Sequence, residues 1–356
     1  MILSRIVLRN FRTYDHLDLT LSPKLTIICG ANAAGKTNLA EAINYISLAR
    51  SWRSSDDSVL LKDGSDYAAI DSYVKEGPLS REIRIEFGKN AKRILINGKP
   101  ARRLSELSKL TNVLRFAPSD VPLFTGSPSE RRSYLDVNLA KQSFDYFELI
   151  ARYNKLLKER NLTLKSRNPD RNLLEVLTDQ LIDVAEPLVR YRSMYIASLN
   201  EVMPGLLERL RGEKTTCRLV YRPFVKPDES FRVRAKKAYQ GALESDLLHG
   251  STSIGPHRED FSMELNGKDI SIYGSQGENR MAVLALKLAP YFLIEDEDKK
   301  PICVLDDVTS ELDENHVKCL FEVLKTAGQV FVTATNLEIQ GASYIDVSAN
   351  NATRRN

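Results

Sequence analysis

Hydrophobic and polar positions follow two different periods along the chain. In the first hundred residues, short apolar or alternating runs at 2–8, 17–21 and 25–29 are typical of strands, and they precede one helical stretch at 38–49. Further strands are predicted at 69–74, 83–87 and 94–96, the last before the hairpin dipeptide Asn97-Gly98. These patterns predict an antiparallel β layer beside an α/β core.

The middle of the chain has helical periodicity. Residues 127–130, Ser-Pro-Ser-Glu, combine an N-cap serine, a proline at the first helical position and a capping-box glutamate. Apolar residues then recur at helical spacing as far as Leu157, and a second series runs over 174–202, with a kink expected at Pro187. Because the polar segment 168–170 separates the two series, an antiparallel helical arm is predicted.

Strand patterns return beyond the arm. Buried strands are predicted at 302–305, 330–333 and 345–347. The expected organisation is therefore an α/β head in two halves, 1–120 and 252–356, with the helical arm inserted at 121–251. Its fold class is α/β, with a mixed sheet core and an antiparallel β layer.

A phosphate-binding loop is predicted between a strand and a helix. Its residues fit the pattern GxxxxGK[ST]: Gly30, Ala31, Asn32, Ala33, Ala34, Gly35, Lys36 and Thr37. Glycines let backbone N–H groups face phosphate oxygens, and a helix N-terminus favours negative charge. Lys36 is then expected to neutralise the phosphates and the Thr37 hydroxyl to bind Mg²⁺. A glycine-rich turn with no ligand gives no reason for the Lys-Thr pair.

The expected partner of this loop is an apolar strand that ends in two carboxylates. Asp306 and Asp307 follow four apolar residues. Asp306 is expected to hold Mg²⁺, and Asp307 to orient or deprotonate the attacking water. A strand end with two aspartates is by itself weak evidence for a metal site. Together with the phosphate-binding loop it becomes strong evidence.

Composition restricts the class of protein. The chain has 356 residues, 42% hydrophobic and 28% charged, and the longest apolar runs are too short to cross a membrane. Its first residues alternate like a strand and do not resemble a secretory signal, so a cytoplasmic location is expected. The four cysteines form no CxxC pair and are interpreted as reduced thiols. A net charge of +4 does not by itself indicate nucleic-acid binding.

A third motif precedes the acidic strand by about thirty residues. Ser275, Gly277 and Glu278 open an apolar helix. Ser275 alone suits a simple helix cap. Its position between the phosphate loop and the acidic strand resembles the signature motif of ATP-binding cassette ATPases. In those enzymes the signature of one subunit covers the γ-phosphate held by another, so the resemblance implies an ATP-dependent homodimer.

Over essentially its whole length the chain resembles the bacterial RecF family of recombination-mediator ATPases. The matching segments are 8–14 (LRNFRTY), 30–38, Pro118-x-Asp120, Pro128-x-x-Arg131-Arg132-x-x-Leu135-Asp136, 153–161 (YNKLLKERN), 255–258 (GPHR) and 306–313. The resemblance implies ATP and Mg²⁺ as cofactors and ATP-dependent binding to DNA at single-strand gaps. It also implies recombinase loading with the RecO and RecR mediator proteins, and a place for Arg12 near the nucleotide. From its chemistry alone, Arg12 could equally be a solvated turn residue.

Two basic clusters are candidate DNA contacts. The first is expected to contact phosphate through Arg209, Arg211, Lys214, Arg232, Arg234, Lys236 and Lys237. A second lies over 152–171. Solvated surface faces explain such clusters equally well. With no base-reading motif, sequence-independent binding is expected.

Other readings stay open. A P-loop phosphotransferase would not need Ser275, and a scaffold of the SMC or Rad50 kind would bind ATP without appreciable turnover. Asp307 stands where most cassette ATPases have glutamate, which favours slow hydrolysis. No histidine occupies the switch position after the strand at 330–333, and His257 is interpreted as a structural loop histidine rather than its substitute.

Overall fold

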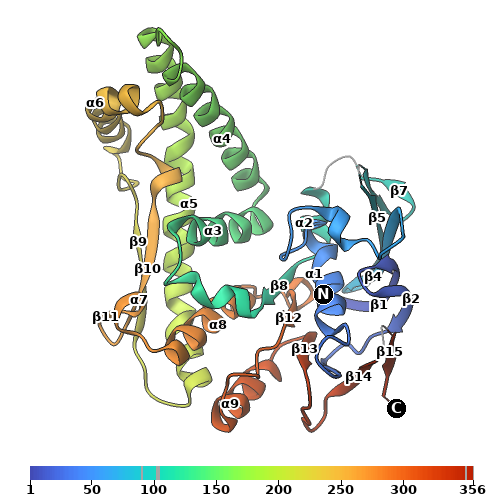
Figure 1. The fold of residues 1–356 in the computed structure, drawn as a ribbon. Helices are drawn as coiled ribbons and strands as arrows, with labels where there is room; N and C mark the ends of the chain where they lie inside the picture. The colour runs from blue at the N-terminus through green and yellow to red at the C-terminus, as the bar shows by residue number, and fades with distance from the viewer. Residues whose placement is uncertain (90, 102–104, 349–350, 356) are drawn as a thin grey trace. The chain divides into compact units, whose positions relative to one another are not determined.

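The computed structural model describes residues 1–89, 91–101, 105–348 and 351–355. The chain divides into two compact units, drawn in Figure 1. The head unit comprises Met1–Val121, Gly205–Lys214 and Arg280–Asn356, and the insert unit comprises Pro122–Pro204 and Thr215–Asn279. The insert unit starts one residue after the expected position and continues to Asn279, whereas the predicted arm ended at residue 251.

A mostly parallel sheet forms one layer of the head unit, with strand order β15-β14-β3-β13-β12-β8. Its strands are β3 (Leu25–Cys29), β8 (Val113–Phe116), β12 (Ile302–Leu305), β13 (Val330–Ala334), β14 (Ser343–Ser348) and β15 (Asn351–Arg354). Only β15 pairs antiparallel. Every residue of β3, β12 and β13 is buried, as expected for parallel strands covered on both faces.

The second layer of the head unit is the predicted antiparallel sheet, with order β2-β1-β4-β5-β6-β7. Its strands are β1 (Ile2–Phe11), β2 (Tyr14–Thr20), β4 (Tyr67–Glu76), β5 (Leu79–Gly88), β6 (Lys92–Ile96) and β7 (Lys99–Pro100). Strands β2 and β5 alternate buried and exposed positions over much of their length, so one face packs on the core and the other faces solvent.

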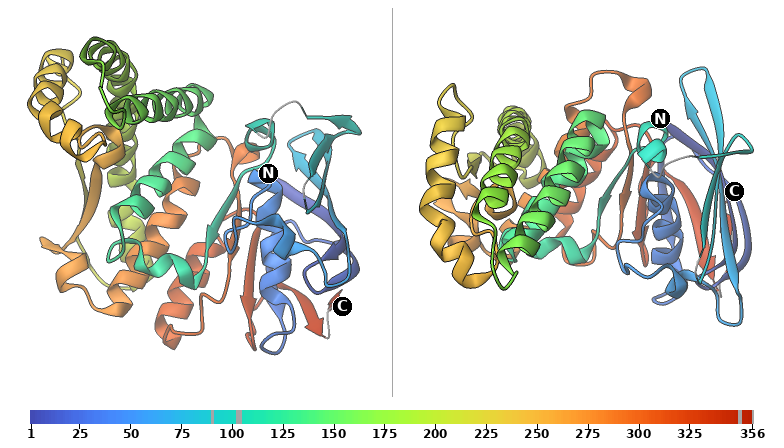
Figure 2. Two further views of the ribbon diagram at one scale, coloured as in Figure 1. Left: turned by 45° about the horizontal axis from the view of Figure 1, so that its top comes forward. Right: turned by 90° about the horizontal axis from the view of Figure 1, so that it is seen from above.

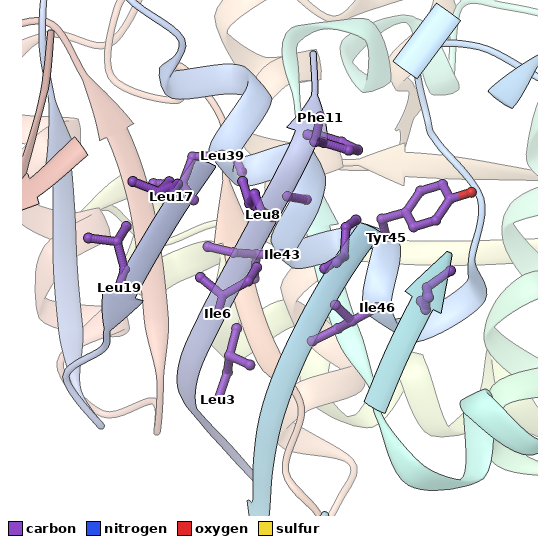
Figure 3. Packing of buried hydrophobic residues seen from close by; sticks show 14 of the residues in the cluster. Leu3, Ile6, Leu8, Phe11, Leu17, Leu19, Leu39, Ile43, Tyr45 and Ile46 are labelled. Atoms are coloured by element: carbon purple, nitrogen blue, oxygen red, sulfur yellow. The ribbon is translucent and has the colours of Figure 1, made fainter. Parts of the chain in front are cut away.

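Helix α1 (Lys36–Leu48) lies between the two sheets of the head unit (Figure 2). Leu39, Ile43 and Ile46 of α1 are fully buried and pack with apolar residues of both sheets (Figure 3). Burying one such side chain contributes about 1.5–3 kcal/mol. The core therefore fixes the start of α1, where the glycine loop ends. The remaining helices of this unit are η1 (Asp57–Leu60), α2 (Ser105–Leu110), η4 (Glu297–Lys299) and α9 (Glu314–Leu324), and η2 (Pro118–Leu123) ends in the insert unit.

The insert unit contains the predicted helices with one correction. The predicted first helical series is two helices, α3 (Pro128–Gln142) and α4 (Phe144–Leu164), because Ser143 ends α3 and caps α4. The predicted capping box at Ser127 is confirmed. α5 (Arg171–Arg211) remains one helix through Pro187 and ends in the head unit.

α4 and α5 run antiparallel, as predicted, since two cross-contacts lie in opposite order along them. The Arg160 Nε donates to the Thr178 hydroxyl over 3.0 Å, and the Arg192 Nε donates to the Tyr146 hydroxyl over 3.0 Å. The beginning of α4 therefore lies beside Arg192 of α5, and the end of α4 lies beside the beginning of α5.

A three-stranded antiparallel sheet, order β11-β10-β9, completes the insert unit together with helix α6 and two short helices, η3 and α7. Its elements are β9 (Cys217–Arg222), α6 (Phe231–His249), η3 (Pro256–Arg258), β10 (Asp260–Leu265), β11 (Lys268–Asp269) and α7 (Ile270–Tyr273). α8 (Gln276–Phe292) begins here and continues into the head unit. This sheet was not predicted: β9 buries a single side chain fully, although the short strand β10 alternates buried and half-buried positions. The insert is therefore not purely helical.

Candidate nucleotide-binding site

The glycine loop lies at the carboxyl end of β3, between that strand and α1. Gly30 and Gly35 have φ of 156° and 112°, backbone angles that residues with a Cβ atom rarely adopt. A Cβ on Gly30 would lie 2.3 Å from the backbone oxygen of Val347 on β14. The Gly35 carbonyl accepts a 3.0 Å hydrogen bond from the buried Tyr14 hydroxyl. The tertiary structure therefore enforces the loop conformation from both flanking sheets.

Lys36 begins α1 and its ammonium group turns back over the loop. Its Nζ donates to the carbonyl oxygens of Gly30 and Ala31, over 2.7 and 2.8 Å. The middle of the loop, Ala31 to Ala33, is exposed. A cation held above exposed backbone is an arrangement that suits a bound phosphate chain.

Thr37 and Asp306 meet although 269 residues separate them in sequence. The Thr37 hydroxyl donates to Asp306 Oδ1 over 3.0 Å. The Thr333 hydroxyl, on β13 between β3 and β12, donates to the same oxygen over 2.8 Å. Asp306 is 5% exposed, and this burial raises its pKa above the usual range although both hydroxyl groups favour the carboxylate.

Thr333 is a site residue that sequence reasoning missed. Its hydroxyl also accepts the Asp307 N–H over 2.8 Å, so one side chain fixes both aspartates. The one sequence signal for Thr333 is a hydroxyl residue near the end of an apolar strand. Its role becomes clear only from the strand order, which places β13 between β3 and β12.

Asp307 is exposed and has an unusual backbone conformation. Its φ of 49° is in the left-handed region, where aspartate is tolerated better than most residues. The buried Arg280 of α8 donates to the carbonyl oxygens of Asp307 and Val308, 3.2 Å each, and forms an ion pair with Glu311. The Ser310 hydroxyl donates to the Asp307 carbonyl over 3.1 Å. These contacts hold the Asp307 backbone directly after the strand end.

Arg12 is bound to protein groups beside α1. Its Nε and NH2 donate to the two carboxylate oxygens of Glu41, over 2.9 and 3.0 Å, and NH1 donates to the Val59 carbonyl over 2.9 Å. Glu41 is 0% exposed and is also contacted by Arg53 and Ser51. The structure therefore gives Arg12 a bidentate ion pair with a buried carboxylate, which accounts for its position without a ligand. Glu41, the one acidic residue of α1, was the signal for such a partner.

The donor chemistry fits a magnesium ion with few protein ligands. Thr37 and Asp306 together offer hard oxygen donors at the strand end, and Mg²⁺ characteristically takes one or two protein oxygens besides phosphate and water. Among the described residues no group of three or more His, Cys, Asp or Glu side chains could enclose a metal ion. The residues therefore suit a metal that arrives with a phosphate ligand.

The signature residues belong to the insert unit. The Ser275 hydroxyl accepts the Glu278 N–H over 3.2 Å, and Glu278 Oε2 accepts the Ser275 N–H over 2.8 Å. This reciprocal pair is a capping box at the start of α8. Ser275 and Gly277 are exposed, so the cap leaves their surface accessible.

The first basic cluster is divided between the units. Arg209, Arg211 and Lys214 lie in the head unit, and the remaining four residues lie in the insert unit on α6. Most cations of the cluster are ion-paired: Arg211 with Glu213, Arg232 with Asp183, Arg234 with Asp228, and Lys236 with Glu175 and Asp179. Arg209, Lys214 and Lys237 are exposed and have no carboxylate partner within the described chain.

One member of the second basic cluster is unavailable for contacts with DNA. Arg160 is fully buried and donates to Asp246 and Thr252, over 2.8 and 2.7 Å. The ion pair lies inside the insert unit and supports its packing. Helical spacing alone could not distinguish this arginine from its exposed neighbours.

Phosphate-loop proteins with an antiparallel β layer over a mostly parallel sheet, and with an inserted second unit, form the ATP-binding cassette class of ATPase heads. The chain belongs to the RecF/RecN/SMC N-terminal domain family, whose model matches residues 2–343. It is 36% identical over 349 residues to the DNA replication and repair protein RecF of Halalkalibacterium halodurans, covering 95% of this chain and 94% of that protein. It is also 36% identical over 343 residues to the protein of the same name from Lachnoclostridium phytofermentans, with the same coverage.

Solved structures agree with this assignment. The structure described as recombination mediator protein RecF-ATP in the RecFOR pathway has a TM-score of 0.90 and 31% identity, covering 100% of this chain and 98% of that chain. An Smc head domain from Pyrococcus furiosus has a TM-score of 0.61 at 15% identity, which shows a shared fold. The predicted family and fold class are confirmed. No helix in the described part of the chain is long and apolar enough to cross a membrane.

Proposed function

We propose that this protein is an ATP-switched DNA-binding protein of recombinational repair and replication restart. The observation that carries the proposal is the contact between Thr37 and Asp306, supported by Thr333, at the carboxyl ends of adjoining strands. Ligands bind at this edge of parallel α/β sheets. Relatives named for DNA replication and repair, similar along nearly the whole chain, supply the biological context and favour it over a phosphotransferase.

In the proposed site, the loop from Gly30 to Thr37 binds the phosphates of ATP. Backbone N–H groups of the loop and the N-terminus of α1 favour the negative charge, and Lys36 supplies a cation to the terminal phosphates. Thr37 and Asp306 would hold Mg²⁺, which when bound would neutralise phosphate charge. RecF structures with ATP support the choice of nucleotide.

Asp307 is the proposed general base or water-orienting group. Its side chain is exposed, while Thr333, Arg280 and Ser310 hold its backbone. The backbone from which the carboxylate extends is thus fixed, and the carboxylate can accept a proton from a water beside the terminal phosphate. Because aspartate is one methylene shorter than glutamate, slow turnover is expected.

Closure of the site requires a second copy of the chain in this proposal. Ser275 and Gly277 are exposed at the start of α8, where backbone N–H groups favour an anion. We propose that they cover the terminal phosphate bound by the other copy. ATP then stabilises a homodimer, and hydrolysis releases it.

DNA is the proposed macromolecular ligand, contacted through phosphates without sequence preference. Arg209, Lys214 and Lys237 are the strongest candidates of the first cluster, because no carboxylate among the described residues neutralises them. Binding at single-strand gaps and cooperation with RecO and RecR would follow from a role in the RecFOR pathway named for the structural relatives. Such a role on chromosomal DNA implies a cytoplasmic protein.

The testing experiment measures mass, ATP binding and turnover of Ser275→Arg against the wild type. We expect the wild-type mass to rise from 40.2 kDa to about 80 kDa with ATP. The variant should still bind ATP but should neither dimerise nor hydrolyse it. Ser166→Arg, in the exposed turn after α4, is the matched control and should behave like the wild type. Wild-type protein that stays monomeric at saturating ATP would refute the proposed switch.

The scaffold alternative makes a different prediction for Asp307→Asn. The switch requires hydrolysis for release, so this variant should remain dimeric with ATP and fail in repair. A scaffold that needs only bound ATP would retain full repair function. Survival of cells after ultraviolet damage, with the variant as the only copy, separates these outcomes.

A further inference from the structure

A cavity of about 280 Å³ lies inside the insert unit. It is bounded by α3, α4, α5 and the loop that contains η3. Its lining includes Arg132 and Ser133 of α3, Asn154 of α4, and His257 of η3. Polar side chains therefore converge on this cavity from helices and a loop distant in sequence, although the ATP site uses none of them.

Two sequence motifs that the nucleotide site leaves unexplained meet at this cavity. The Arg-Arg motif of α3 contributes Arg132, and the Gly-Pro-His-Arg motif contributes His257. The Arg132 NH1 donates to the carbonyl oxygen of Glu259, 2.8 Å away, which joins α3 to the residue after η3. The motifs therefore form one local structure.

The arginines near the cavity differ in how their charges are balanced. Arg131 forms a bidentate ion pair with Asp260, with distances of 2.7 and 2.9 Å. Arg192, 1% exposed, contacts Asp136 and Glu259, both over 2.8 Å. Their charges are neutralised within the protein.

Arg132 and Arg258 are not neutralised in this way. Within the described residues, Arg132 has no carboxylate partner within ion-pair distance, and its NH1 instead donates to a carbonyl oxygen. Arg258 is exposed and contacts only the Thr252 carbonyl, at 3.5 Å, in the part of the chain that the structure describes. Burial, with Arg192 and Arg258 nearby, lowers the pKa of Arg132. This crowding of positive charge would be relieved by a bound anion.

Asp136 also lines the cavity, but its carboxylate is held in an ion pair with Arg192, and two further lining groups suit a tetrahedral oxyanion. Ser133 and Asn154 are exposed and can donate from a hydroxyl and an amide. Among the described lining residues the aromatic rings are Tyr153, which is buried, and His257, whose Nδ1 is bonded to the Tyr153 hydroxyl. No exposed ring is therefore offered for stacking a base. The site would recognise a phosphate group and ignore base identity.

We propose that this cavity binds a backbone phosphate of DNA, with Arg132 as the principal contact. A backbone phosphate is favoured over a free nucleotide, since the lining provides neither a stacking surface nor a glycine loop. The inference rests on the proposed DNA-binding function and adds a site outside both basic clusters. Guanidinium groups form directed, charge-assisted bonds to phosphate, and lysine does so less specifically.

The test measures affinity for a fluorescent 30-base-pair duplex with a single-strand gap, at several salt concentrations with ATP. Arg132→Gln should weaken binding about tenfold and reduce the salt slope by about one. Ser133→Glu places a negative charge in the cavity lining while leaving the Arg132 contact with Glu259 intact. It should weaken binding similarly, so the test remains decisive if Arg132→Gln misfolds.

Matched controls carry the same charge changes outside the cavity. Arg93→Gln removes an exposed arginine of β6, and Val137→Glu adds a carboxylate to an exposed position of α3. Both should bind DNA within about twofold of the wild type. ATP binding should be unchanged in all four variants, since loss of nucleotide binding would point to misfolding and not to the cavity.

The outcomes separate the two proposals. If wild-type protein binds the duplex but both cavity variants match their controls, the cavity site is refuted and the DNA-binding function stands. If equal losses occur in cavity and control variants, general charge explains the effect and the site is refuted. If wild-type protein does not bind DNA in any nucleotide state, the proposed function itself fails, together with this site.

Discussion

His257 should make the insert unit sensitive to mild acid. Its Nδ1 lies 2.7 Å from the Tyr153 hydroxyl, and its Nε2 lies 3.0 Å from the carbonyl oxygen of Thr252. A carbonyl oxygen only accepts, so Nε2 carries the proton and Nδ1 accepts from Tyr153. The imidazole is therefore held neutral, and its protonation must disturb the contact with Tyr153.

Burial lowers the pKa of His257 from its ordinary 6.5 to about 4. Arg258 and Arg132 lower it further, while the Thr252 carbonyl and Asp246 act in the opposite direction. A histidine with a lowered folded-state pKa contributes stability above the unfolded value. That contribution is lost as the pH falls from 6.5 toward 4, because the unfolded chain then binds the proton more tightly.

The size of this effect follows from the two pKa values. A difference of one pKa unit corresponds to about 1.4 kcal/mol. The difference between the unfolded and folded pKa of His257 therefore contributes about 3 kcal/mol to the unfolding free energy. Between pH 7 and pH 4.5, proton linkage removes about 2 kcal/mol of unfolding free energy through this residue. The comparison variant is His257→Gln, which cannot ionise but can accept from Tyr153 and donate to Thr252.

Urea unfolding at several pH values measures the effect. The informative quantity is the change of the unfolding free energy with pH, because the substitution itself also alters stability at pH 7. We expect wild type to lose about 2 kcal/mol more than His257→Gln between pH 7 and pH 4.5. Selective labelling of histidine for NMR provides a direct check, since the chain has four histidines and the variant identifies one resonance.

Parallel stability curves for wild type and His257→Gln would refute the linkage argument. A His257 resonance that titrates near 6.5 would refute its premise, that burial keeps the ring neutral. Loss of DNA binding in His257→Gln without a stability change would show that the ring contacts the ligand directly.

Three further predictions concern the head unit. Asp306→Asn should abolish ATP hydrolysis without lowering the thermal midpoint, because burial raises the pKa of Asp306 and disfavours its charged form; a clear fall in the midpoint would contradict this. Arg12→Gln should destabilise nucleotide-free protein by about 3 kcal/mol in urea unfolding, since the fully buried Glu41 loses its bidentate partner. Unchanged stability together with weaker ATP binding would instead show that Arg12 contacts the nucleotide. Gly30→Ala should abolish ATP binding in calorimetry, because its Cβ would meet the Val347 carbonyl oxygen at 2.3 Å, and normal binding would show that the loop can relax.

The glycine loop between β3 and α1 was predictable because its chemistry is local. Gly30, Gly35, Lys36 and Thr37 are close in sequence, and backbone freedom, charge and a hydroxyl group must occur there in a fixed order. The strand that ends at Asp306 was predictable for a similar reason, since fully buried parallel strands form continuous apolar runs. The first helical series was predicted less well, because helical periodicity continued across the break at Ser143.

Contacts between distant segments were not predictable from such patterns. Thr333 became a site residue only because the sheet places β13 between β3 and β12. Arg12 and Arg160 look like surface cations in the sequence, yet each meets a buried carboxylate on another element. Charge alone does not reveal whether a cation has a partner.

The sequence alone predicted the glycine loop, the acidic strand end, the capping box at Ser127 and a head with an inserted helical segment. Each depends on residues that are neighbours along the chain, so spacing and residue type suffice. Tertiary structure decided which arginines remain unpaired and which motifs meet at the cavity lined by Arg132. It also brought the Thr37 and Thr333 hydroxyls to one carboxylate oxygen, since strand order and helix packing determine contacts between residues far apart in sequence.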